Sequence, residues 1–372
     1  MGSLMVLIDG LGDDPIPALG GKTPLELARP KGWQYLADCG TQAQVSICEK
    51  DLVPESCSCI LRLLGVAKKD IPSNRAYLEL LAHNRDISEY EMVLRCNLVA
   101  VDKDQHLVAF NGQGLSPQEM AECAAACEGI LQEIEFIHLS EYRNLLIMDK
   151  KASLLDCRVP PPHESLGGRM PQLLEGINKS LAVSFFLKEA KRRLAPFSRE
   201  GLHYELYPWG PSARQLLPSF TSLHGLKGGM VCKAEIVLGM ARALGMQVQV
   251  PSGATGDVDT NIGAKAKATL ELLQTCDFVM AHFNGTDEAA HRYDYREKAA
   301  FIEKIDQEFL QPILEKVTDP LRILICGDHV TSSVTGKHGP GPVPVVAAAI
   351  NSSKDILTID NYQDILKFMM RE

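Results

Sequence analysis

The sequence predicts an α/β protein with a mostly parallel sheet and helices on both of its faces. Short, continuous apolar runs alternate with segments whose apolar residues recur at helical spacing. Strands that are apolar throughout are typical of a parallel sheet covered on both faces. Polar motifs also follow directly after three of the apolar runs. Because open α/β sheets bind ligands beyond the carboxyl ends of their strands, these motifs mark a candidate site.

The elements of this core are expected in the first part and in the last third of the chain. Continuous apolar runs of four to eight residues indicate strands, and longer segments with apolar residues on one face indicate helices. The expected strands span residues 4–8, 42–47, 247–250, 278–283, 321–326 and 343–350, and the expected helices span residues 24–39, 234–244, 262–273 and 297–317.

Residues 91–217 differ in sequence pattern from the two parts that flank them. Because the polar motifs lie before and after this stretch, we expect a discontinuous core of residues 1–90 and 218–372. Residues 91–217 would then form an inserted α+β domain that caps the site. The first part alone is too short for a stable α/β domain, which supports this division. The insert's expected strands span residues 93–101, 107–111 and 144–148, and its expected helices span residues 117–130 and 182–194.

Composition narrows the classes of partner. The chain has 372 residues, of which 45% are hydrophobic, so it can bury a large core. Its formal net charge of -9 argues against a nucleic-acid-binding surface and favours a small-molecule partner. It shows neither a signal-peptide pattern nor an apolar stretch of membrane-spanning length, so we expect a cytoplasmic protein without a membrane partner. The eleven cysteines, scattered and odd in number, favour reduced thiols.

Residue types that bind divalent metals gather in three short motifs and one nearby loop. Each motif begins where an apolar run ends, so its side chains are expected at the carboxyl edge of the sheet. Three Asp and three His in this arrangement are typical of a two-metal hydrolytic or phosphoryl-transfer site. The candidate ligands are Asp9, Asp287, His291, Asp328, His329 and His338.

Each motif by itself also has a plainer interpretation. Asp9, which precedes Gly10, suits an ordinary turn at the end of a strand, and Asp287 suits a helix N-cap. Asp287 and His291 are four residues apart, so a helical turn would place both on one face, where they can chelate one ion. The metal interpretation is favoured because the alternative requires a separate plain explanation for every one of these motifs. It would also leave their joint occurrence in this order unexplained.

The order of the motifs resembles one known family. The motifs are Asp-Gly-Leu-Gly-Asp (9–13), Gly-Lys-Thr-Pro-Leu-Glu (21–26), Arg-Cys-Asn-Leu-Val-Ala-Val-Asp (95–102), Pro-Ser-Gly-Ala-Thr-Gly (251–256), Gly-Thr-Asp-Glu-Ala-Ala-His (285–291), Gly-Asp-His (327–329) and His-Gly-Pro-Gly-Pro-Val-Pro (338–344). Together they resemble the archaeal-type, cofactor-independent phosphoglycerate mutases of the alkaline phosphatase superfamily. The resemblance spans nearly the whole chain.

This resemblance implies an alkaline-phosphatase-like core that interconverts 3-phosphoglycerate and 2-phosphoglycerate through a phosphoserine, without 2,3-bisphosphoglycerate. It also implies two divalent ions, which are manganese, magnesium or zinc in that family. One ion would be held by Asp287, His291 and His338. The other would be held by Asp9, Asp328, His329 and the serine oxygen.

The resemblance places the nucleophilic serine in the segment 54–60. The flanks of this segment register with the family loop without a gap, which puts Ser56 at the nucleophile and leaves Ser58 as the reserve candidate. Either serine also suits a plain helix N-cap. Glu55 replaces a glycine of the family loop, Cys57 an acidic residue and Ile60 a histidine. Because a carboxylate beside the nucleophile repels an incoming phosphate, we expect weakened or redirected catalysis.

The same resemblance implies substrate-binding residues. Arg75 stands where the family has Gly-Arg-Gly, and Arg95 and Asn97 lie in the best-matched part of the insert. His163 resembles a Pro-His element of the insert, and Lys227 is a further cationic candidate. Arginine forks suit phosphate and carboxylate groups. For each of these residues, surface charge or loop packing is an equally good explanation.

Three functions remain open from the sequence. The leading one is the phosphoglycerate mutase. The second is a related phosphomonoester hydrolase or sugar-phosphate mutase on the same core. The third is a catalytically weak paralogue that binds metal and a phosphorylated metabolite, which only the altered serine segment favours. The sequence predicts neither the identity of the metal nor the oligomeric state.

Overall fold

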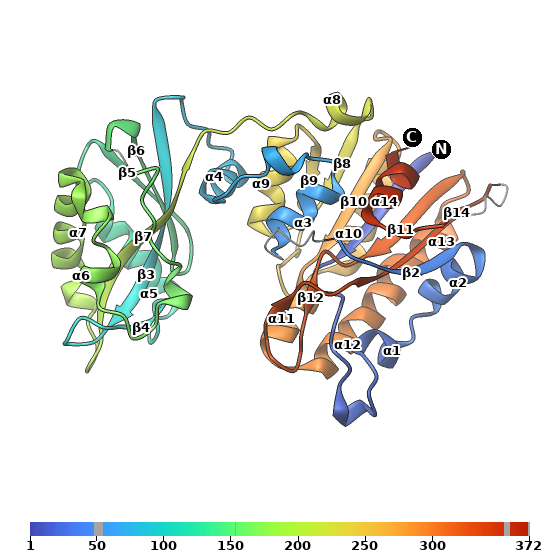
Figure 1. Cartoon of the computed structure of the whole chain (residues 1–372), viewed down its shortest axis with the longest axis horizontal. Helices are drawn as coiled ribbons and strands as arrows, with labels where there is room; N and C mark the ends of the chain where they lie inside the picture. The colour runs from blue at the N-terminus through green and yellow to red at the C-terminus, as the bar shows by residue number, and fades with distance from the viewer. Residues whose placement is uncertain (48–54, 153, 353–357, 371–372) are drawn as a thin grey trace. The chain divides into compact units, whose positions relative to one another are not determined.

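The computed structural model describes residues 1–47, 55–152, 154–352 and 358–370. It divides into two compact units, which are described separately (Figure 1). Unit 1 comprises Met1–Ile71 and Leu217–Glu372, and unit 2 comprises Pro72–Leu216. Unit 2 therefore begins before residue 91, the expected boundary. The reason is that helix α4 (Ala76–Ala82) packs on two strands of unit 2.

Unit 1 is built on a seven-stranded sheet in the order β2-β14-β11-β1-β10-β8-β9. Strand β14 runs antiparallel to its two neighbours, and the other pairings are parallel. The central strands are buried along almost their whole length, which is why they are apolar throughout. The strands are β1 (Gly2–Ile8), β2 (Thr41–Val45), β8 (Gly228–Val231), β9 (Gln247–Gln249), β10 (Phe278–Phe283), β11 (Leu321–Cys326) and β14 (Val343–Ile350).

Helices cover both faces of this sheet, as predicted. On one face, α2 (Lys31–Cys39), α10 (Ile262–Leu273) and α12 (Tyr295–Ile305) share an apolar core with alternate residues of β1 and β10. On the other face, α14 (Tyr362–Met370) packs on β1 and β11 and contacts α3 (Ser56–Leu63), which in turn contacts α9 (Glu235–Ala243). The shorter elements of unit 1 are α1 (Pro24–Ala28), α8 (Phe220–His224), α11 (Gly285–His291), α13 (Gln311–Lys316), β12 (Val330–Thr331) and β13 (His338–Gly339).

Two expected helices differ from the prediction. The helix expected over residues 24–39 is broken into α1 and α2, because Arg29 adopts a left-handed conformation (φ 46°) and Pro30 follows it. The helix expected over residues 297–317 is α12 followed by a π-helical segment (Asp306–Leu310) and α13. The carboxylate of Asp306 accepts hydrogen bonds from the backbone N–H groups of Gly32 (2.9 Å) and Trp33 (3.2 Å). It therefore caps α2, which has no capping side chain of its own.

Unit 2 is an antiparallel sheet centred on β3 (Glu91–Val101). Met92, Leu94 and Cys96 of this strand join the core formed with α5 (Pro117–Cys127) and α7 (Leu181–Leu194). Val93 instead packs with α4 on the opposite face. Because side chains alternate along a strand, Arg95 and Asn97 share the face of α4. The remaining elements are β4 (Leu107–Ala109), β5 (Ile134–Ser140), β6 (Arg143–Asp149), β7 (His203–Ala213) and α6 (Met170–Leu173).

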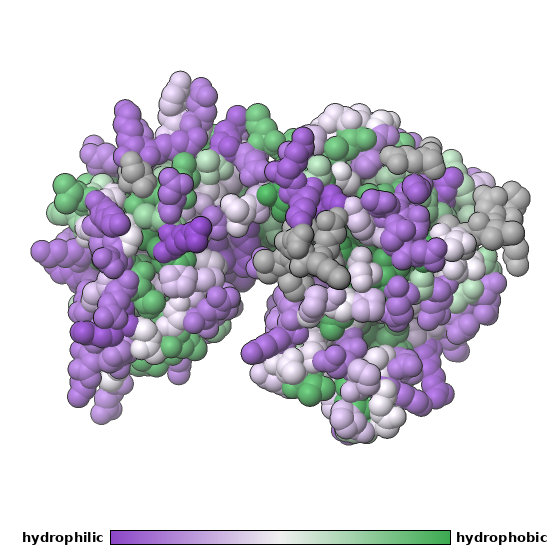
Figure 2. Space-filling view, viewed as in Figure 1, coloured by the Kyte–Doolittle hydropathy of each residue, from purple (hydrophilic) through white to green (hydrophobic). Residues whose placement is uncertain are grey.

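On the visible face, polar side chains predominate and apolar ones form small, scattered groups (Figure 2). None of the cysteines that the structure describes forms a disulfide bond. Within the described part of the chain, no helix is both long and apolar enough to cross a membrane.

Candidate metal centre

The three polar motifs converge at the carboxyl edge of the sheet of unit 1. Asp9 follows β1 directly, Asp328 lies two residues beyond β11, and α11 begins two residues after β10 ends. Strands β10, β1 and β11 are neighbours in the sheet and run parallel. Their carboxyl ends therefore bring together residues that are more than 300 positions apart in the sequence.

Asp9, Asp328 and His329 form the first group of candidate ligands. Their ligand atoms lie within 4.8 Å of one another, and all three side chains are buried. The Nε2 atom of His329 is 3.4 Å from Asp9 Oδ1 and 3.3 Å from Asp328 Oδ2. No residue that the structure describes donates a hydrogen bond to Asp328 Oδ2, although this atom is buried. A buried carboxylate oxygen without a donor fits a metal ligand.

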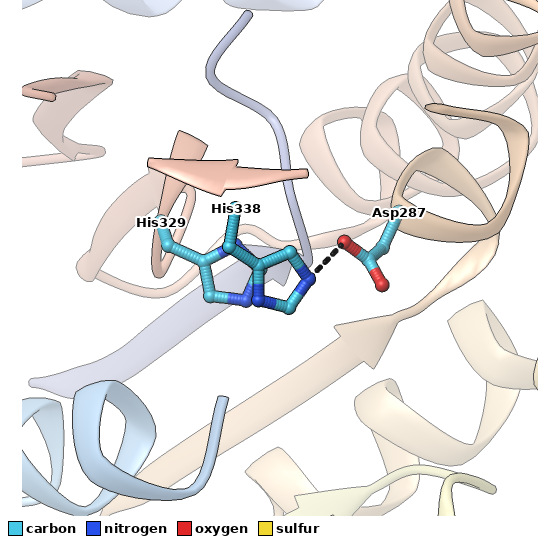
Figure 3. A group of neighbouring side chains, drawn as sticks. All are labelled: Asp287, His329 and His338. Atoms are coloured by element: carbon cyan, nitrogen blue, oxygen red, sulfur yellow. Dashed lines mark ion pairs between the residues drawn. The ribbon is translucent and has the colours of Figure 1, made fainter. Parts of the chain in front are cut away.

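Asp287 and His338 form the second group, which His329 also adjoins. The two imidazole rings stack with centroids 4.0 Å apart, and His338 Nε2 lies 3.3 Å from Asp287 Oδ1 (Figure 3). His291 Nε2 lies 3.1 Å both from Asp287 Oδ2 and from His338 Nε2, at the exposed edge of the group. The structure thus brings together the three residues expected at one ion. It also places His329 between the two groups.

The electrostatics of this cluster favour a bound cation. Burial and the neighbouring carboxylates of Asp328 and Asp287 raise the pKa of Asp9 well above its usual range. Burial acts in the same direction on Asp287, but hydrogen bonds from His291 and His338 hold its pKa well below the usual range. Carboxylate and imidazole ligands together suit divalent ions such as zinc and manganese. A divalent ion would also remove the repulsion between the buried carboxylates.

Ser56 is the first residue of α3, and its hydroxyl faces the first group. Its Oγ lies 3.2 Å from Asp9 Oδ2 and 3.3 Å from His329 Nε2. The hydroxyl of the reserve candidate, Ser58, instead donates to the backbone oxygen of Glu55 at 3.1 Å. The geometry therefore favours Ser56 over Ser58 as a nucleophile.

The three replaced residues of the serine segment differ in exposure. Glu55 occupies the N-cap position of α3, where it is exposed and its side chain makes no capping hydrogen bond. Cys57 and Ile60 are buried in the apolar core. Only Glu55 therefore adds a charge beside the hydroxyl of Ser56.

Four further residues, which are not among the predicted site residues, shape this site. The hydroxyl of Thr331 donates to Asp287 Oδ1 at 2.6 Å and lies 3.1 Å from His329 Nδ1. Thr286 donates to the backbone oxygen of Asp9, and His282 Nε2 lies 3.3 Å from the carboxylate of Asp9. Gly10 has a positive φ of 63°, and a Cβ atom there would lie 2.6 Å from the hydroxyl of Thr331. In the sequence, the available signals are the polar His282 inside an apolar run, and the places of Gly10 and Thr286 within the motifs 9–13 and 285–291.

Four of the five substrate candidates belong to unit 2, where a single carboxylate organises two of them. Glu79 Oε1 lies 3.0 Å from Arg75 Nε, and Glu79 Oε2 accepts from Arg95 Nε at 2.9 Å. The guanidinium of Arg95 lies over the ring of Trp209, 4.0 Å from its centroid. Trp209 Nε1 in turn donates to Asn97 Oδ1 at 3.0 Å. We call these five residues the arginine cluster.

The arginine cluster retains unused hydrogen-bonding capacity. Among the described residues, no acceptor pairs by a hydrogen bond with the Nη atoms of Arg75 or Arg95. Arg95 is nevertheless buried, and this burial lowers its pKa to about 10. Two guanidinium groups anchored through Nε leave their forked ends for an anion.

The two remaining substrate candidates differ in outcome. The ring of His163 lies at the edge of the arginine cluster, with its centroid 6.3 Å from that of Trp209. Lys227 lies elsewhere, because it precedes β8 and its backbone oxygen accepts from the N–H groups of Asp277 and Phe278. It is therefore at the amino edge of the sheet, roughly 20 Å from the carboxyl edge for a six-residue strand such as β10. This position gives no support to a role for Lys227 beside the metal centre, and its substrate-binding role stays a prediction.

Comparison with known protein families gives a match along nearly the whole chain. A family model described as the Metalloenzyme superfamily matches residues 1–360. The 2,3-bisphosphoglycerate-independent phosphoglycerate mutase of Thermococcus kodakarensis is 31% identical over 364 residues, which cover 93% of this chain and 87% of that protein. The protein of the same name from Methanothrix thermoacetophila is 28% identical over 373 residues, covering 97% and 94%.

Solved structures show the same fold. A protein from Pyrococcus horikoshii superimposes with a TM-score of 0.77 at 26% identity, covering 98% of this chain and 92% of that one. The cofactor-independent phosphoglycerate mutase of Thermoplasma acidophilum gives a TM-score of 0.64 at 22% identity, covering 100% and 99%. These likenesses confirm the predicted α/β fold.

Proposed function

We propose an activity for this chain from one premise: it belongs to the Metalloenzyme superfamily and, within it, to the family of the 2,3-bisphosphoglycerate-independent phosphoglycerate mutases. The activity is the interconversion of 3-phosphoglycerate and 2-phosphoglycerate without a bisphosphoglycerate cofactor. One observation carries the proposal. The hydroxyl of Ser56 lies within 3.3 Å of Asp9 and His329, beside two groups of metal-binding side chains.

The residues of the centre fit two divalent ions, with manganese, magnesium and zinc as the candidates. When bound, such ions lower the pKa of a serine hydroxyl and neutralise charge that develops on a transferring phosphoryl group. The two sets of ligands are Asp9, Asp328 and His329 with Ser56, and Asp287, His291 and His338.

Ser56 transfers the phosphoryl group in two steps. Its Oγ forms a bond to phosphorus while the bond to one glycerate oxygen breaks, and the hydroxyl proton passes to that oxygen. Phosphoserine 56 then returns the phosphoryl group to the other glycerate hydroxyl, which restores the serine hydroxyl. The phosphoryl group stays on the protein between the steps, so no bisphosphorylated cofactor is needed. Asp9 and His329 hold the Oγ of Ser56 in place.

The arginine cluster of unit 2 supplies the contacts to the anionic substrate. Arg75 and Arg95 are oriented by one shared carboxylate, that of Glu79, and their Nη atoms suit the carboxylate or the phosphate of phosphoglycerate. Asn97, a member of the cluster, and His163, at its edge, are further polar groups there. The expectation that this unit caps the site stays a prediction.

The test is a product assay with matched serine variants. Metal-free protein is loaded with Mn²⁺ and incubated with 3-phosphoglycerate, and 2-phosphoglycerate and free phosphate are followed together. Ser56→Ala should lower the rate by at least about 10³-fold, as loss of a nucleophile does. Ser58→Ala is the control, because its hydroxyl bonds a backbone oxygen within the same helical turn. It should retain most of the activity.

Other results would redirect the assignment. Free phosphate without 2-phosphoglycerate would identify a hydrolase on the same core. Equal loss of activity in Ser56→Ala and Ser58→Ala would contradict the role given to Ser56. The absence of both products from protein that contains Mn²⁺ would refute the phosphoglycerate assignment and favour a metal- and metabolite-binding paralogue.

A further inference from the structure

Lys298 on α12 is a fully buried lysine that the proposed reaction does not use. Its Nζ donates to three oxygens: Gly12 O at 3.1 Å, Asp13 Oδ2 at 2.7 Å and Thr331 O at 2.8 Å. These acceptors match the three hydrogens of an ammonium group. The side chain of Asp13 is as fully buried as that of Lys298.

The three acceptors lie directly beyond residues of the metal centre. Gly12 is three positions after Asp9, and Thr331 is two positions after His329. Lys298 itself belongs to the helix that follows α11, the carrier of Asp287. A single ammonium group of α12 therefore joins two segments that carry candidate ligands, and α12 itself follows the helix that carries Asp287.

Thr331 extends this link to the ligand side chains. Its hydroxyl donates to Asp287 Oδ1 at 2.6 Å and adjoins Nδ1 of His329. Thr331 also pairs with His338 across β12 and β13. Displacement of Thr331 would therefore shift ligands of both groups.

Asp13 closes the network on its other side. Its Oδ1 accepts from the backbone N–H of Ser333 at 2.9 Å, and its Oδ2 accepts from the hydroxyl of Ser333 at 2.6 Å. The segment that begins at His329 is therefore held twice, by Lys298 at Thr331 and by Asp13 at Ser333.

The small net stability expected from a buried ion pair indicates that Lys298 and Asp13 serve to position the ligand segments. A buried ion pair contributes little net stability, because desolvation of both charges offsets their attraction, and apolar replacements are often tolerated. By contrast, removal of a group that orients metal ligands without binding the metal itself typically weakens metal affinity about 10–100-fold.

We propose that Lys298 and Asp13 are positioning residues, which set the separation of the two ligand groups before metal binds. The proposal rests on the metal centre of the proposed function. Lys298 acts by fixing the backbone at Gly12 and Thr331, and Asp13 acts by fixing the backbone at Ser333.

The test uses Mn²⁺ alone, titrated calorimetrically into metal-free protein, with urea unfolding measured in parallel. The main variant is the double substitution Lys298→Met and Asp13→Asn, which removes both charges together and leaves neither one buried without a partner. The matched control is the double substitution Lys191→Met and Glu205→Gln, which also removes both charges of an ion pair. Lys191 Nζ lies 2.6 Å from Glu205 Oε1, and both residues belong to unit 2, which carries none of the candidate ligands.

We expect the double variant to bind Mn²⁺ roughly 10–100-fold more weakly than the wild type. The Lys191→Met and Glu205→Gln control should bind it with wild-type affinity. A double variant whose dissociation constant stays within about twofold of wild type would overturn the proposal, and so would an equal weakening in the control.

A milder variant keeps the proposal testable if the double variant does not fold. Ser333→Ala removes only the hydroxyl bonded to Asp13, and it should still weaken Mn²⁺ binding. Unchanged affinity in Ser333→Ala would then overturn the proposal. Wild-type protein that takes up no Mn²⁺ would instead refute the metal centre itself, and the positioning role with it.

Discussion

Unit 1 buries carboxylates that face one another, whereas unit 2 buries the guanidinium group of Arg95, which shares one carboxylate with the partly exposed Arg75. In unit 1, Asp9, Asp287 and Asp328 lie at one edge of a parallel sheet, and the burial of Asp9 raises its pKa. In unit 2, Glu79 lies between Arg75 and Arg95, and burial lowers the pKa of Arg95 to about 10. Each cluster thus holds an excess of one charge, which is buried in unit 1 and partly exposed at Arg75 in unit 2.

This difference suits the two units to ligands of opposite charge. Buried charge of one sign is unfavourable unless a partner of the opposite sign neutralises it. The carboxylates of unit 1 suit divalent cations, and the arginines of unit 2 suit an anion. Removal of one charge should therefore stabilise the protein without ligand and weaken ligand binding, which is the opposite of what removal of a structural group does.

The largest effect is expected in unit 1 for Asp328→Asn. The asparagine keeps the acceptor used by the N–H groups of Gly10 and His329, and it replaces an oxygen that has no described donor by an N–H₂ group. We expect the metal-free variant to be more stable than metal-free wild type by about 1–3 kcal/mol in urea unfolding. We also expect at least about 100-fold weaker Mn²⁺ binding, measured by calorimetry.

Asp306→Asn is the control for this substitution. Asp306 is also buried, but its carboxylate accepts the N–H groups of Gly32 and Trp33 at the start of α2. Its replacement should destabilise the protein by about 1–3 kcal/mol and leave Mn²⁺ affinity unchanged. Loss of stability in both variants would show that Asp328 is a structural residue.

The second effect concerns unit 2 and Arg95→Met. Loss of one or two charged hydrogen bonds to the substrate should lower kcat/KM for 3-phosphoglycerate by about 10–150-fold, with Mn²⁺ affinity unchanged. Arg95→Lys should not restore activity, because an ammonium group reproduces neither the fork nor the stacking on Trp209. Steady-state kinetics measures both variants.

Arg85→Met is the matched control in the same unit. Arg85 forms an ion pair with Glu135 in which both side chains are about half exposed. Its removal should leave kcat/KM within about twofold of wild type. If Arg95→Met behaves in the same way as Arg85→Met, the arginine cluster packs the unit and does not bind substrate.

The smallest effect is expected for the stability that the Asp86–Arg214 ion pair of unit 2 contributes. This pair has no excess charge of either sign. Hydrogen bonds from Arg214 and Tyr77 lower the pKa of Asp86 to about 2. Because the folded pKa lies below that of the unfolded chain, the stabilisation is present above about pH 4 and is lost as the pH falls toward 2. The pair is half exposed, so we expect less than about 1 kcal/mol.

Urea unfolding of wild type and Asp86→Asn between pH 2 and 6 measures this contribution. The two curves should differ above pH 4 and meet near pH 2. A constant difference across this range would mean that the carboxylate contributes through packing, and that its ionisation is irrelevant to stability.

The sequence alone was sufficient for the parallel core and for the family. Apolar runs predicted β10 and β11 with the observed bounds, because strands buried on both faces must be apolar along their length. The motif order led to the six candidate metal ligands and to Ser56, which the structure brings together at one edge of the sheet. The break between α1 and α2 was missed although it follows from Pro30, because the apolar spacing continues across it.

Only the tertiary structure decided which of the other polar residues take part. Lys227 and Lys298 look alike in the sequence, yet the first lies at the amino edge of the sheet and the second donates to the backbone beside two ligand segments. Likewise, Glu79 accepts a hydrogen bond from Arg95 only because α4 packs against β3 in the folded chain. The local spacing of apolar residues predicts whether a side chain is buried and on which face of its helix or strand it lies, because both depend on residues nearby in the sequence. Which distant charge it meets depends on strand order and register, and these are fixed only when the whole chain packs.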